Sequence, residues 1–195
     1  QALAEQWARP GRQLFNTYGP TEATVSASLA ELHAGQPVTI GQALPNYGLM
    51  VIEPIDADAQ APGVPPTLKL LPFGETGELC ITGPGVAAGY LGRPDLTAEK
   101  FLPNPWARNE QEARLYRTGD LARVENGTQM QCLGRADDQV KIRGFRVELG
   151  EIEAVLAEQP GVGTTAVLLR KDEGLEQLVA FMVPSGDAPP APAAL

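Results

Sequence analysis

Side chains that could do chemistry first gather in the stretch "NTYGPTE", residues 16–22. A Gly-Pro turn places the hydroxyl of Thr21 beside the carboxylate of Glu22 at the entrance to a strand-like run. Such hard oxygens suit a magnesium–phosphate site. The ring of Tyr18, just before the turn, could lie against a nucleobase or another flat ligand. A plain turn capped by Thr21 is the alternative, so the stretch indicates a ligand site without fixing the ligand.

A second acidic candidate lies in "YRTGDL", residues 116–121. Here Asp120 follows a Thr-Gly pair at the start of a predicted strand. A carboxylate on a tight turn can accept both hydroxyls of a ribose, although an ordinary turn Asp is the commoner case. The motif alone therefore leaves both interpretations open.

The longest unusual stretch is "GRADDQVKIRGFRVELGEIE", residues 134–153. Arg135 precedes two acidic residues, and Lys141 and Arg143 follow on a predicted strand-turn-strand. Alternation along a strand sends Lys141 and Arg143 to one face. This order of cations fits a polyanionic ligand, and Gly144 would permit its close approach to the backbone.

The elements that must position these residues indicate a mixed α/β fold. We expect a helix over 2–8, a hairpin over 115–135 joined at "ENG", and a helix over 151–158. Further strands are expected at 13–18, 24–32 and 47–54, with two more within 67–85; a proline-rich loop covers 54–66, and a helix with Asp95 as a possible cap starts near 93. A boundary near Asp137 separates a large unit from a small β-α-β-β unit.

Composition and charge exclude several classes of protein. The 195 residues are 43% hydrophobic and 20% charged, as in globular domains, and the net charge of -9 argues against nucleic acid. No apolar run approaches the roughly 20 residues of a membrane span. Cys80 and Cys132 have no zinc-site spacing and predict free thiols in the cytoplasm. Basic residues nevertheless concentrate between Arg114 and Arg146, which suits either a phosphorylated ligand or a solvated face.

In this order, the motifs "NTYGPTE", "GELCITGPGVAAGYL", "YRTGDL" and "GRADDQVKIRGFRVELGEIE" resemble those of the adenylation domains of nonribosomal peptide synthetases. These domains belong to the wider family of adenylate-forming enzymes. The resemblance implies a two-step reaction that uses Mg-ATP. A carboxylic acid, most often an amino acid, is activated to an acyl-adenylate and then passes to the phosphopantetheine thiol of a carrier protein.

The same resemblance assigns residues to the nucleotide. Tyr18 would stack on adenine, Gly19 would belong to the same cofactor-binding set, and Thr21 would bind phosphate or adenylate. Glu22 would hold magnesium. Asp120 and Arg135 complete the expected nucleotide set, Asp120 at the ribose hydroxyls and Arg135 at the ribose and phosphate. Thr21, Glu22 and Arg135 are thus the expected catalytic residues.

The resemblance also implies residues for the acid and for the second half-reaction. Part of the acid pocket would be lined by Thr17, Val25 and Ser26. A hinge is expected at Asp137, about which a small C-terminal subdomain rotates. The face presented for thiolation would carry Lys141, Arg143 and Gly144.

For the fold, the resemblance implies the C-terminal part of a large adenylation subdomain over 1–136, with strands and a distorted β-barrel. An incomplete small α+β subdomain follows over 137–184, and an Ala/Pro-rich tail over 185–195. The family's phosphate loop and C-terminal lysine motif have no match here, and Ala88 stands where Arg is usual. We therefore expect an enzyme as the parent and an inactive fragment here, completed by the remainder of the domain and neighbouring synthetase domains.

Two alternatives remain open from the residues. The same chemistry occurs in acyl- and aryl-CoA ligases, which use a different acceptor. A non-catalytic split or scaffold domain that completes another polypeptide is the second, because a missing half would leave apolar surface to be covered.

Overall fold

The computed structural model describes residues 1–55, 66–125, 127–137, 139–142, 145–172 and 175–186. The chain divides into two compact units, Gln1–Ala136 and Asp137–Leu195, which are described in turn. Residues 56–65 of the expected proline-rich loop and 187–195 of the expected tail lie outside the described residues. Among the residues that the structure describes, no helix is long and apolar enough to cross a bilayer.

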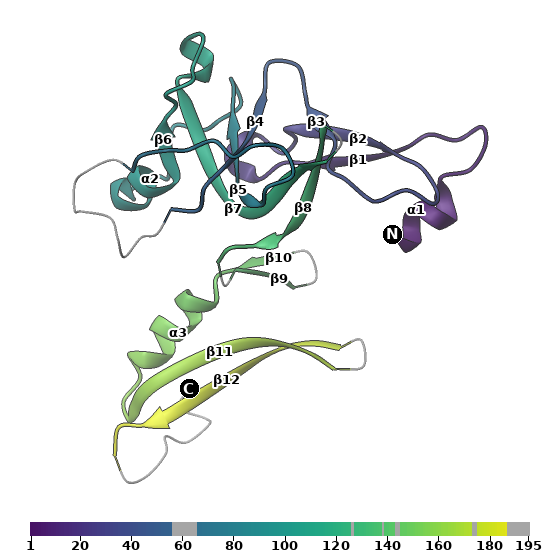
Figure 1. Cartoon of the computed structure of the whole chain (residues 1–195). Helices are drawn as coiled ribbons and strands as arrows, with labels where there is room; N and C mark the ends of the chain where they lie inside the picture. Colours follow the sequence, from purple (N-terminus) through teal and green to yellow (C-terminus); the bar gives the residue numbers. More distant parts are fainter. Residues whose placement is uncertain (56–65, 126, 138, 143–144, 173–174, 187–195) are drawn as a thin grey trace. The chain divides into compact units, whose positions relative to one another are not determined.

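The first unit begins with a short helix and a three-stranded antiparallel sheet (Figure 1). These elements are α1 (Ala2–Trp7), β1 (Leu14–Tyr18), β2 (Ser28–Leu32) and β3 (Gln42–Ala43). Along β1 the side chains alternate, so that Tyr18 is half-buried whereas Phe15 and Thr17 are exposed. The strand pleat therefore sends Tyr18 and Thr17 to opposite faces.

The predicted strand over 24–32 is shorter than expected. Its first residues belong instead to the 3-10 helix η1 (Thr21–Ala23) and the turn that follows, and β2 starts only at Ser28. Thr24 and Val25 adopt positive φ angles of 56° and 70°, which ends any extended run at that point.

The centre of the first unit is an antiparallel sheet in the order β4-β5-β7-β6, with β8 paired to β7. The bounds are β4 (Gly48–Ile52), β5 (Gly77–Thr82), β6 (Phe101–Pro103), β7 (Arg114–Glu125) and β8 (Gln129–Arg135). Every residue of β5 is buried, Cys80 included, because β4 and β7 flank the strand and apolar side chains cover it. The pairing of β7 with β8 confirms the predicted hairpin.

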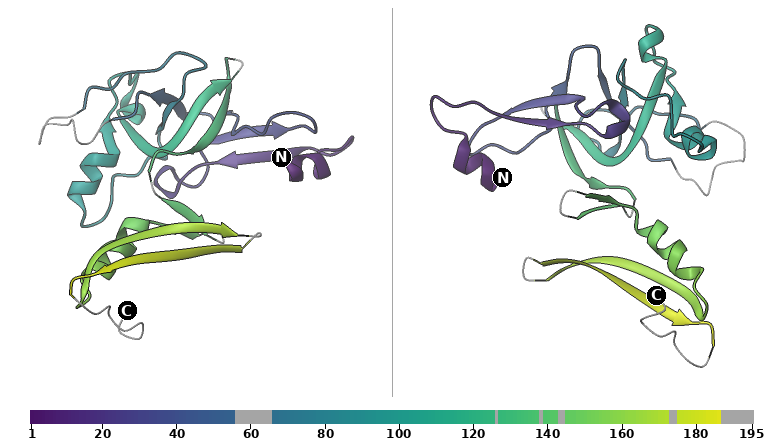
Figure 2. Two further views of the ribbon diagram at one scale, coloured as in Figure 1. Left: turned by 60° about the horizontal axis from the view of Figure 1, so that its bottom comes forward. Right: turned by 180° about the vertical axis from the view of Figure 1, so that it is seen from behind.

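The β7 strand is bent along its length, as the two views in Figure 2 show. Its register shifts once against β5, between Glu78 and Cys80, and once against β8, between Leu121 and Ala122. Bulges of this kind bend a strand and re-aim its side chains, often beside functional sites. Of the two strands expected within 67–85, only β5 forms, and Leu70 contributes a single bridge to Ile52.

Helix α2 (Pro94–Lys100) starts differently from the prediction. Its N-cap is Arg93, with Pro94 in the first turn, and no side chain caps the helix. Asp95 instead pairs with Arg93 at 2.9 Å, and this guanidinium lowers the pKa of Asp95 to about 2. The expected cap is therefore wrong, because Pro94 already supplies the first helical residue. A second 3-10 helix, η2 (Glu110–Glu112), precedes β7.

The mixed α/β class is as expected, with sheets outweighing helices. The expected distorted barrel does not close within the described ranges. The reason is local: β3 is short, and the contact of its neighbour Gly41 with Met130 of β8 is an isolated bridge rather than a ladder. Two separate sheets are the result.

The second unit combines two hairpins and one helix. Its elements are β9 (Val140–Ile142), β10 (Phe145–Val147), α3 (Leu149–Ala157), β11 (Val162–Asp172) and β12 (Leu175–Pro184). Helix α3 lies along β11, where Glu153 accepts the amide of Val167 at 2.7 Å (Figure 1). On the opposite face of this hairpin Leu168 and Phe181 are exposed.

Candidate functional site

Three of the expected residues meet in the first unit: Tyr18 from β1, Asp120 from β7 and Arg135 from β8. The hydroxyl of Tyr18 donates a hydrogen bond to Oδ2 of Asp120. Nη1 of Arg135 lies 2.8 Å from Oδ1 of the same carboxylate, and both side chains of this ion pair are largely buried. One carboxylate thus joins a phenol and a guanidinium that are far apart in sequence.

The local electrostatics keep Tyr18 a hydrogen-bond donor. Burial, reinforced by the charge of Asp120, raises the pKa of the Tyr18 hydroxyl well above its ordinary value. The phenol therefore stays protonated at physiological pH and can donate its hydrogen bond to the carboxylate. The arrangement offers a flat ring, a carboxylate with further lone pairs and a cation, which is the donor and acceptor set that a nucleoside phosphate needs.

The turn that carries Asp120 is fastened by its own side chains. The hydroxyl of Thr118 donates to the carbonyl of Leu79 at 2.8 Å and accepts the amide of Asp120 at 3.0 Å. Nη2 of Arg135 donates to the carbonyl of Thr118 at 3.2 Å. Strand pairing and Thr118 therefore both contribute to the position of Asp120.

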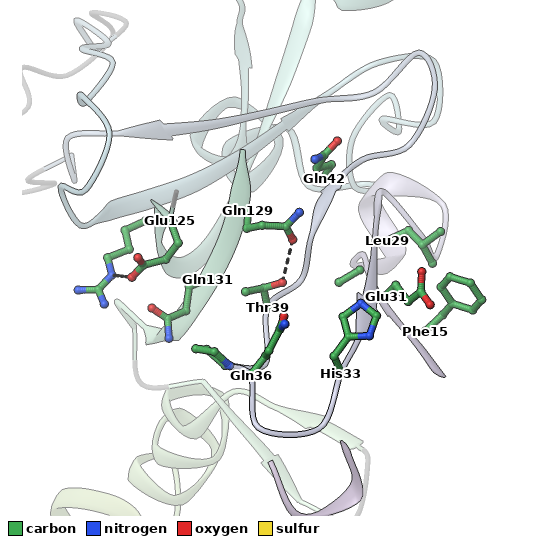
Figure 3. A pocket seen from close by; sticks show the side chains of 13 residues that line it. Phe15, Leu29, Glu31, His33, Gln36, Thr39, Gln42, Glu125, Gln129 and Gln131 are labelled. Atoms are coloured by element: carbon green, nitrogen blue, oxygen red, sulfur yellow. Dashed lines mark hydrogen bonds and ion pairs between the residues drawn. The ribbon is translucent and has the colours of Figure 1, made fainter. Parts of the chain in front are cut away.

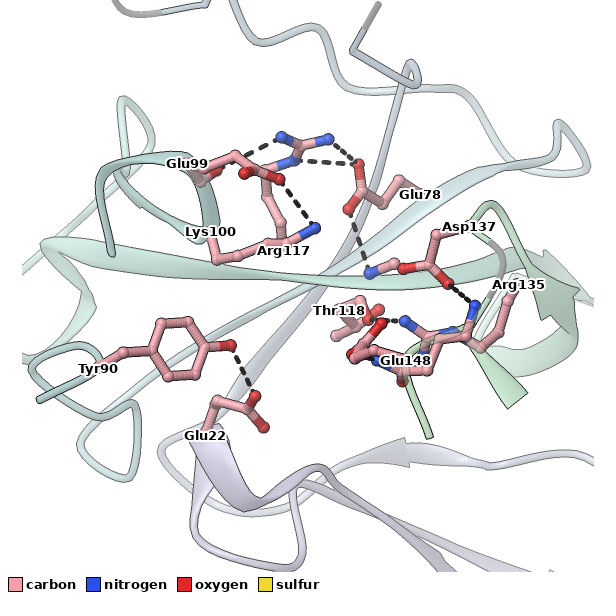
Figure 4. Close-up of polar contacts among 12 residues, drawn as sticks. Glu22, Glu78, Tyr90, Glu99, Lys100, Arg117, Thr118, Arg135, Asp137 and Glu148 are labelled. Atoms are coloured by element: carbon pink, nitrogen blue, oxygen red, sulfur yellow. Dashed lines mark hydrogen bonds and ion pairs between the residues drawn. The ribbon is translucent and has the colours of Figure 1, made fainter. Parts of the chain in front are cut away.

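Glu22, the expected magnesium ligand, is buried in η1 with 8% of its surface exposed. The hydroxyl of Tyr90 donates to its Oε1 at 2.7 Å (Figure 4). Among the described residues, no group of three or more His, Cys, Asp and Glu could hold a metal. A single carboxylate still fits magnesium, which is commonly bound by one or two carboxylates together with substrate phosphates. Thr21 beside it is exposed, so its hydroxyl is open to a ligand.

The η1 segment is held by the loop over 83–90. The amide of Ala87 donates to the carbonyl of Glu22 at 2.9 Å, and the hydroxyl of Thr24 donates to the carbonyl of Gly85 at 2.8 Å. These contacts maintain the left-handed backbone of Thr24 and Val25, which is costly for β-branched residues. Strain of this kind is concentrated at functional sites.

The expected acid-pocket residues do not form one buried set. Val25 is 74% exposed, Thr17 is exposed and Ser26 is half-buried. Gly19 has a clear packing reason: a Cβ there would lie 2.6 Å from the carbonyl oxygen of Val25 and 2.7 Å from the amide nitrogen of Ala27. The chain itself therefore requires this glycine, whatever ligand binds nearby.

The residues expected in the second half-reaction belong to the second unit. Asp137 is its first residue and is exposed, and Lys141 lies in β9. Arg143 and Gly144 lie outside the described residues.

A pocket of about 640 Å³ opens elsewhere on the first unit (Figure 3). It is lined by Phe15, Leu29, His33 and Arg123, among others, and by none of the expected site residues. Its residues come from β1, β2, the segment 33–39, β3, β7 and β8. This pocket is therefore separate from the Tyr18–Asp120–Arg135 cluster.

Sequence reasoning missed three polar residues of the site region. Tyr90 contacts Glu22, Thr118 supports Asp120, and Glu78 is buried at 3% exposure in β5. Glu78 gave a signal that could have been used, because an acidic residue at the head of an otherwise apolar strand needs a buried partner. The contacts of Tyr90 and Thr118 carried no local signal.

Comparisons with known proteins find a family model and several relatives that are similar to this chain. The model of the AMP-binding enzyme family matches residues 1–91. A delta-poly-L-ornithine synthetase of Acinetobacter baumannii is 60% identical over 187 residues, which cover 96% of this chain and 13% of that protein. The chain thus spans about an eighth of that relative.

Two solved structures resemble the chain in fold as well as sequence. An artificially fused adenylation–PCP didomain of a nonribosomal peptide synthetase from Klebsiella oxytoca has a TM-score of 0.66 and 30% identity. It is covered over 31% of its length, and 90% of this chain is matched. A four-domain nonribosomal peptide synthetase bound to AMP and glycine has a TM-score of 0.53 and 38% identity, over 90% of this chain and 12% of its own. The chain is therefore similar to the AMP-binding enzyme family over residues 1–91, and over nearly its whole length to parts of nonribosomal peptide synthetases that contain an adenylation domain.

Proposed function

We propose that this chain contributes the nucleotide-binding part of an adenylation domain that activates an amino acid with ATP. The observation that carries the proposal is the convergence of Tyr18, Asp120 and Arg135 from three strands. The Asp120 carboxylate retains acceptor capacity beyond these two partners, because two oxygens offer about four lone-pair sites. It would accept the ribose hydroxyls, while the ring of Tyr18 lies against adenine and Arg135 faces the ribose and phosphate.

The phosphate groups of ATP would be bound at η1. Thr21 would donate its exposed hydroxyl to a phosphate or adenylate oxygen, and Glu22 would hold magnesium with Tyr90 fixing the orientation of its carboxylate. Magnesium, when bound, neutralises phosphate charge and orients the phosphates for in-line attack. The contribution of the protein is positioning and charge stabilisation, which together can supply most of the rate acceleration of such a reaction.

The substrate would be an amino acid and the acceptor a carrier protein. A relative is named for poly-L-ornithine synthesis, one neighbour is bound to glycine, and another is fused to a PCP domain. Thr17, Val25 and Ser26 would contribute part of the acid pocket. Transfer to the phosphopantetheine thiol would involve a hinge at Asp137 and a face that includes Lys141, Arg143 and Gly144.

The test is acid-dependent ATP–pyrophosphate exchange across a panel of amino, aryl and keto acids. The 195-residue chain would be assayed beside a complete adenylation domain that contains it. Exchange with one or a few amino acids in the complete domain, lost in Asp120→Ala, would support the proposal. Exchange with aryl acids followed by transfer to coenzyme A would favour a CoA ligase instead.

A folded complete domain that exchanges with no acid would favour a non-catalytic scaffold. The hinge is tested separately by Asp137→Pro, because proline restricts φ at that position. This variant should retain exchange and slow thioester formation on a carrier protein. Equal loss of both steps would contradict the hinge.

A further inference from the structure

The geometry points to Glu78 as a positioning residue for the nucleotide: its buried carboxylate holds the turn that presents Asp120. This inference rests on the proposed function, since it concerns how the proposed ribose ligand is held. Glu78 contacts neither Asp120 nor Arg135 in any described interaction and acts through the backbone of β7.

The need for Glu78 comes from the bulge between β5 and β7. Glu78 pairs with Leu121 and Cys80 pairs with Arg117, so β7 has more residues than β5 between these pairs. The extra residues include Gly119, whose φ of 74° turns its amide away from a regular ladder. Buried backbone groups that leave a ladder must find other partners.

Two side chains and one backbone amide supply those partners. Oε1 of Glu78 accepts the amide of Gly119 at 3.2 Å, and the hydroxyl of Thr118 accepts the amide of Asp120. The carbonyl of Gly119 accepts the amide of Ala136 at 2.8 Å. Of these partners, Glu78 is the one that comes from β5, so it ties the turn to the most buried strand of the sheet.

An ion pair with Arg117 offsets the cost of burying the charged carboxylate of Glu78. Oε2 of Glu78 accepts from Nε and Nη2 of Arg117 at 3.0 and 2.7 Å, with side-chain exposures of 3% and 13% (Figure 4). A buried ion pair gives little net stability over an apolar pair of similar volume. The presence of Glu78 is therefore better explained by its other carboxylate oxygen, Oε1. This oxygen fixes the amide of Gly119, directly before Asp120.

The experiment compares ATP with 2′-deoxy-ATP in acid-dependent exchange by the complete adenylation domain. In the unaltered domain, loss of a ribose hydroxyl that bonds a carboxylate should lower kcat/KM by about tenfold or more. In Glu78→Gln, a misplaced Asp120 should reduce this discrimination to about threefold or less, with most of the change in the KM for ATP. Discrimination that stays at its original value would overturn the inference.

A second variant separates positioning from folding. Glu78→Met combined with Arg117→Met removes both charges at similar volume, so the fold should persist. We expect a folded protein that has lost the discrimination between ATP and 2′-deoxy-ATP. A folded protein that keeps this discrimination would contradict the inference. Glu53→Gln is the matched control, because its pair with Lys69 at 3.3 Å is exposed on both sides and should leave discrimination unchanged.

The same data distinguish failure of the proposed function. If the unaltered domain does not distinguish the two nucleotides, or if Asp120→Ala does not alter their ratio, the ribose role itself is wrong. If both behave as expected and only the Glu78 variants fail to respond, the ribose role stands and the positioning role of Glu78 is wrong.

Discussion

Replacing Asp120 by Ala should lower the free energy of unfolding of the first unit, and the contacts of the Asp120 carboxylate determine by how much. The carboxylate accepts the hydroxyl of Tyr18 and pairs with Arg135 at 2.8 Å, with side-chain exposures of 16% and 18% in the ion pair. Removal leaves a largely buried phenol and guanidinium without this acceptor. Hydrogen bonds to charged groups are worth about 1.5–3 kcal/mol each and are not additive, so we expect a loss of about 2–4 kcal/mol.

Urea unfolding of the 195-residue chain, followed by tryptophan fluorescence, would measure this loss. Trp7 and Trp106 are the two tryptophans of the sequence, and both belong to the first unit. Trp106 packs against the core cluster that includes Ile52 and Leu115, so its emission reports on that core.

The matched control is Glu53→Ala. Glu53 also forms an ion pair with a cation, Lys69, but the two side chains are 56% and 64% exposed. Exposed substitutions of this kind stay within about 0.5 kcal/mol. If Asp120→Ala were no more destabilising than the control, the Tyr18–Asp120–Arg135 cluster would not be the buried network described above.

Three further predictions follow from individual contacts. Tyr90→Phe removes the hydrogen bond to Glu22 and should raise the magnesium concentration for half-maximal exchange; an unchanged magnesium titration would contradict the role of Tyr90. Val25→Gly should raise the free energy of unfolding by about 1 kcal/mol in urea, because its φ is 70° and its side chain is exposed, whereas a loss would argue against a strained backbone. Burial raises the pKa of the Cys80 thiol, so the neutral form is favoured in the folded chain. Stability should therefore fall as pH rises above about 8.5, and Cys80→Ala, measured by urea unfolding at pH 7 and 10, should show a smaller fall than the unaltered chain.

Local sequence signals were sufficient to predict those elements that depend on residues only a few positions apart. The "ENG" segment predicted the pairing of β7 with β8, and the helix expected over 151–158 coincides with most of α3 (Leu149–Ala157). Both depend on turn chemistry and on the periodicity of apolar residues, which act over a few positions.

The residues directly after Glu22 do not form the expected strand, because tertiary contacts override local preference. Thr24 and Val25 are β-branched and favour strands, yet contacts with Gly85 and Ala87 hold this segment in a left-handed turn. No pattern within the run itself indicates those partners.

Local physics does not predict the contacts of the candidate site, whose residues lie in separate family motifs. Tyr18 and Asp120 are 102 positions apart, and nothing in either motif predicts that the hydroxyl of one would meet the carboxylate of the other. The role of Glu78 depends on a register shift between β5 and β7, which alternation alone does not show. Strand register and bulges are set by packing of the whole sheet.

Nucleotide binding by the Tyr18–Asp120–Arg135 cluster can be tested through the affinity of AMP for the complete adenylation domain, measured by isothermal titration calorimetry. We expect Asp120→Asn, which keeps the shape of the side chain and removes its charge, to weaken binding about tenfold or more. Glu53→Gln should leave the affinity unchanged. Equal affinity of the unaltered domain and a folded Asp120→Asn variant would contradict the claim that this cluster binds the nucleotide.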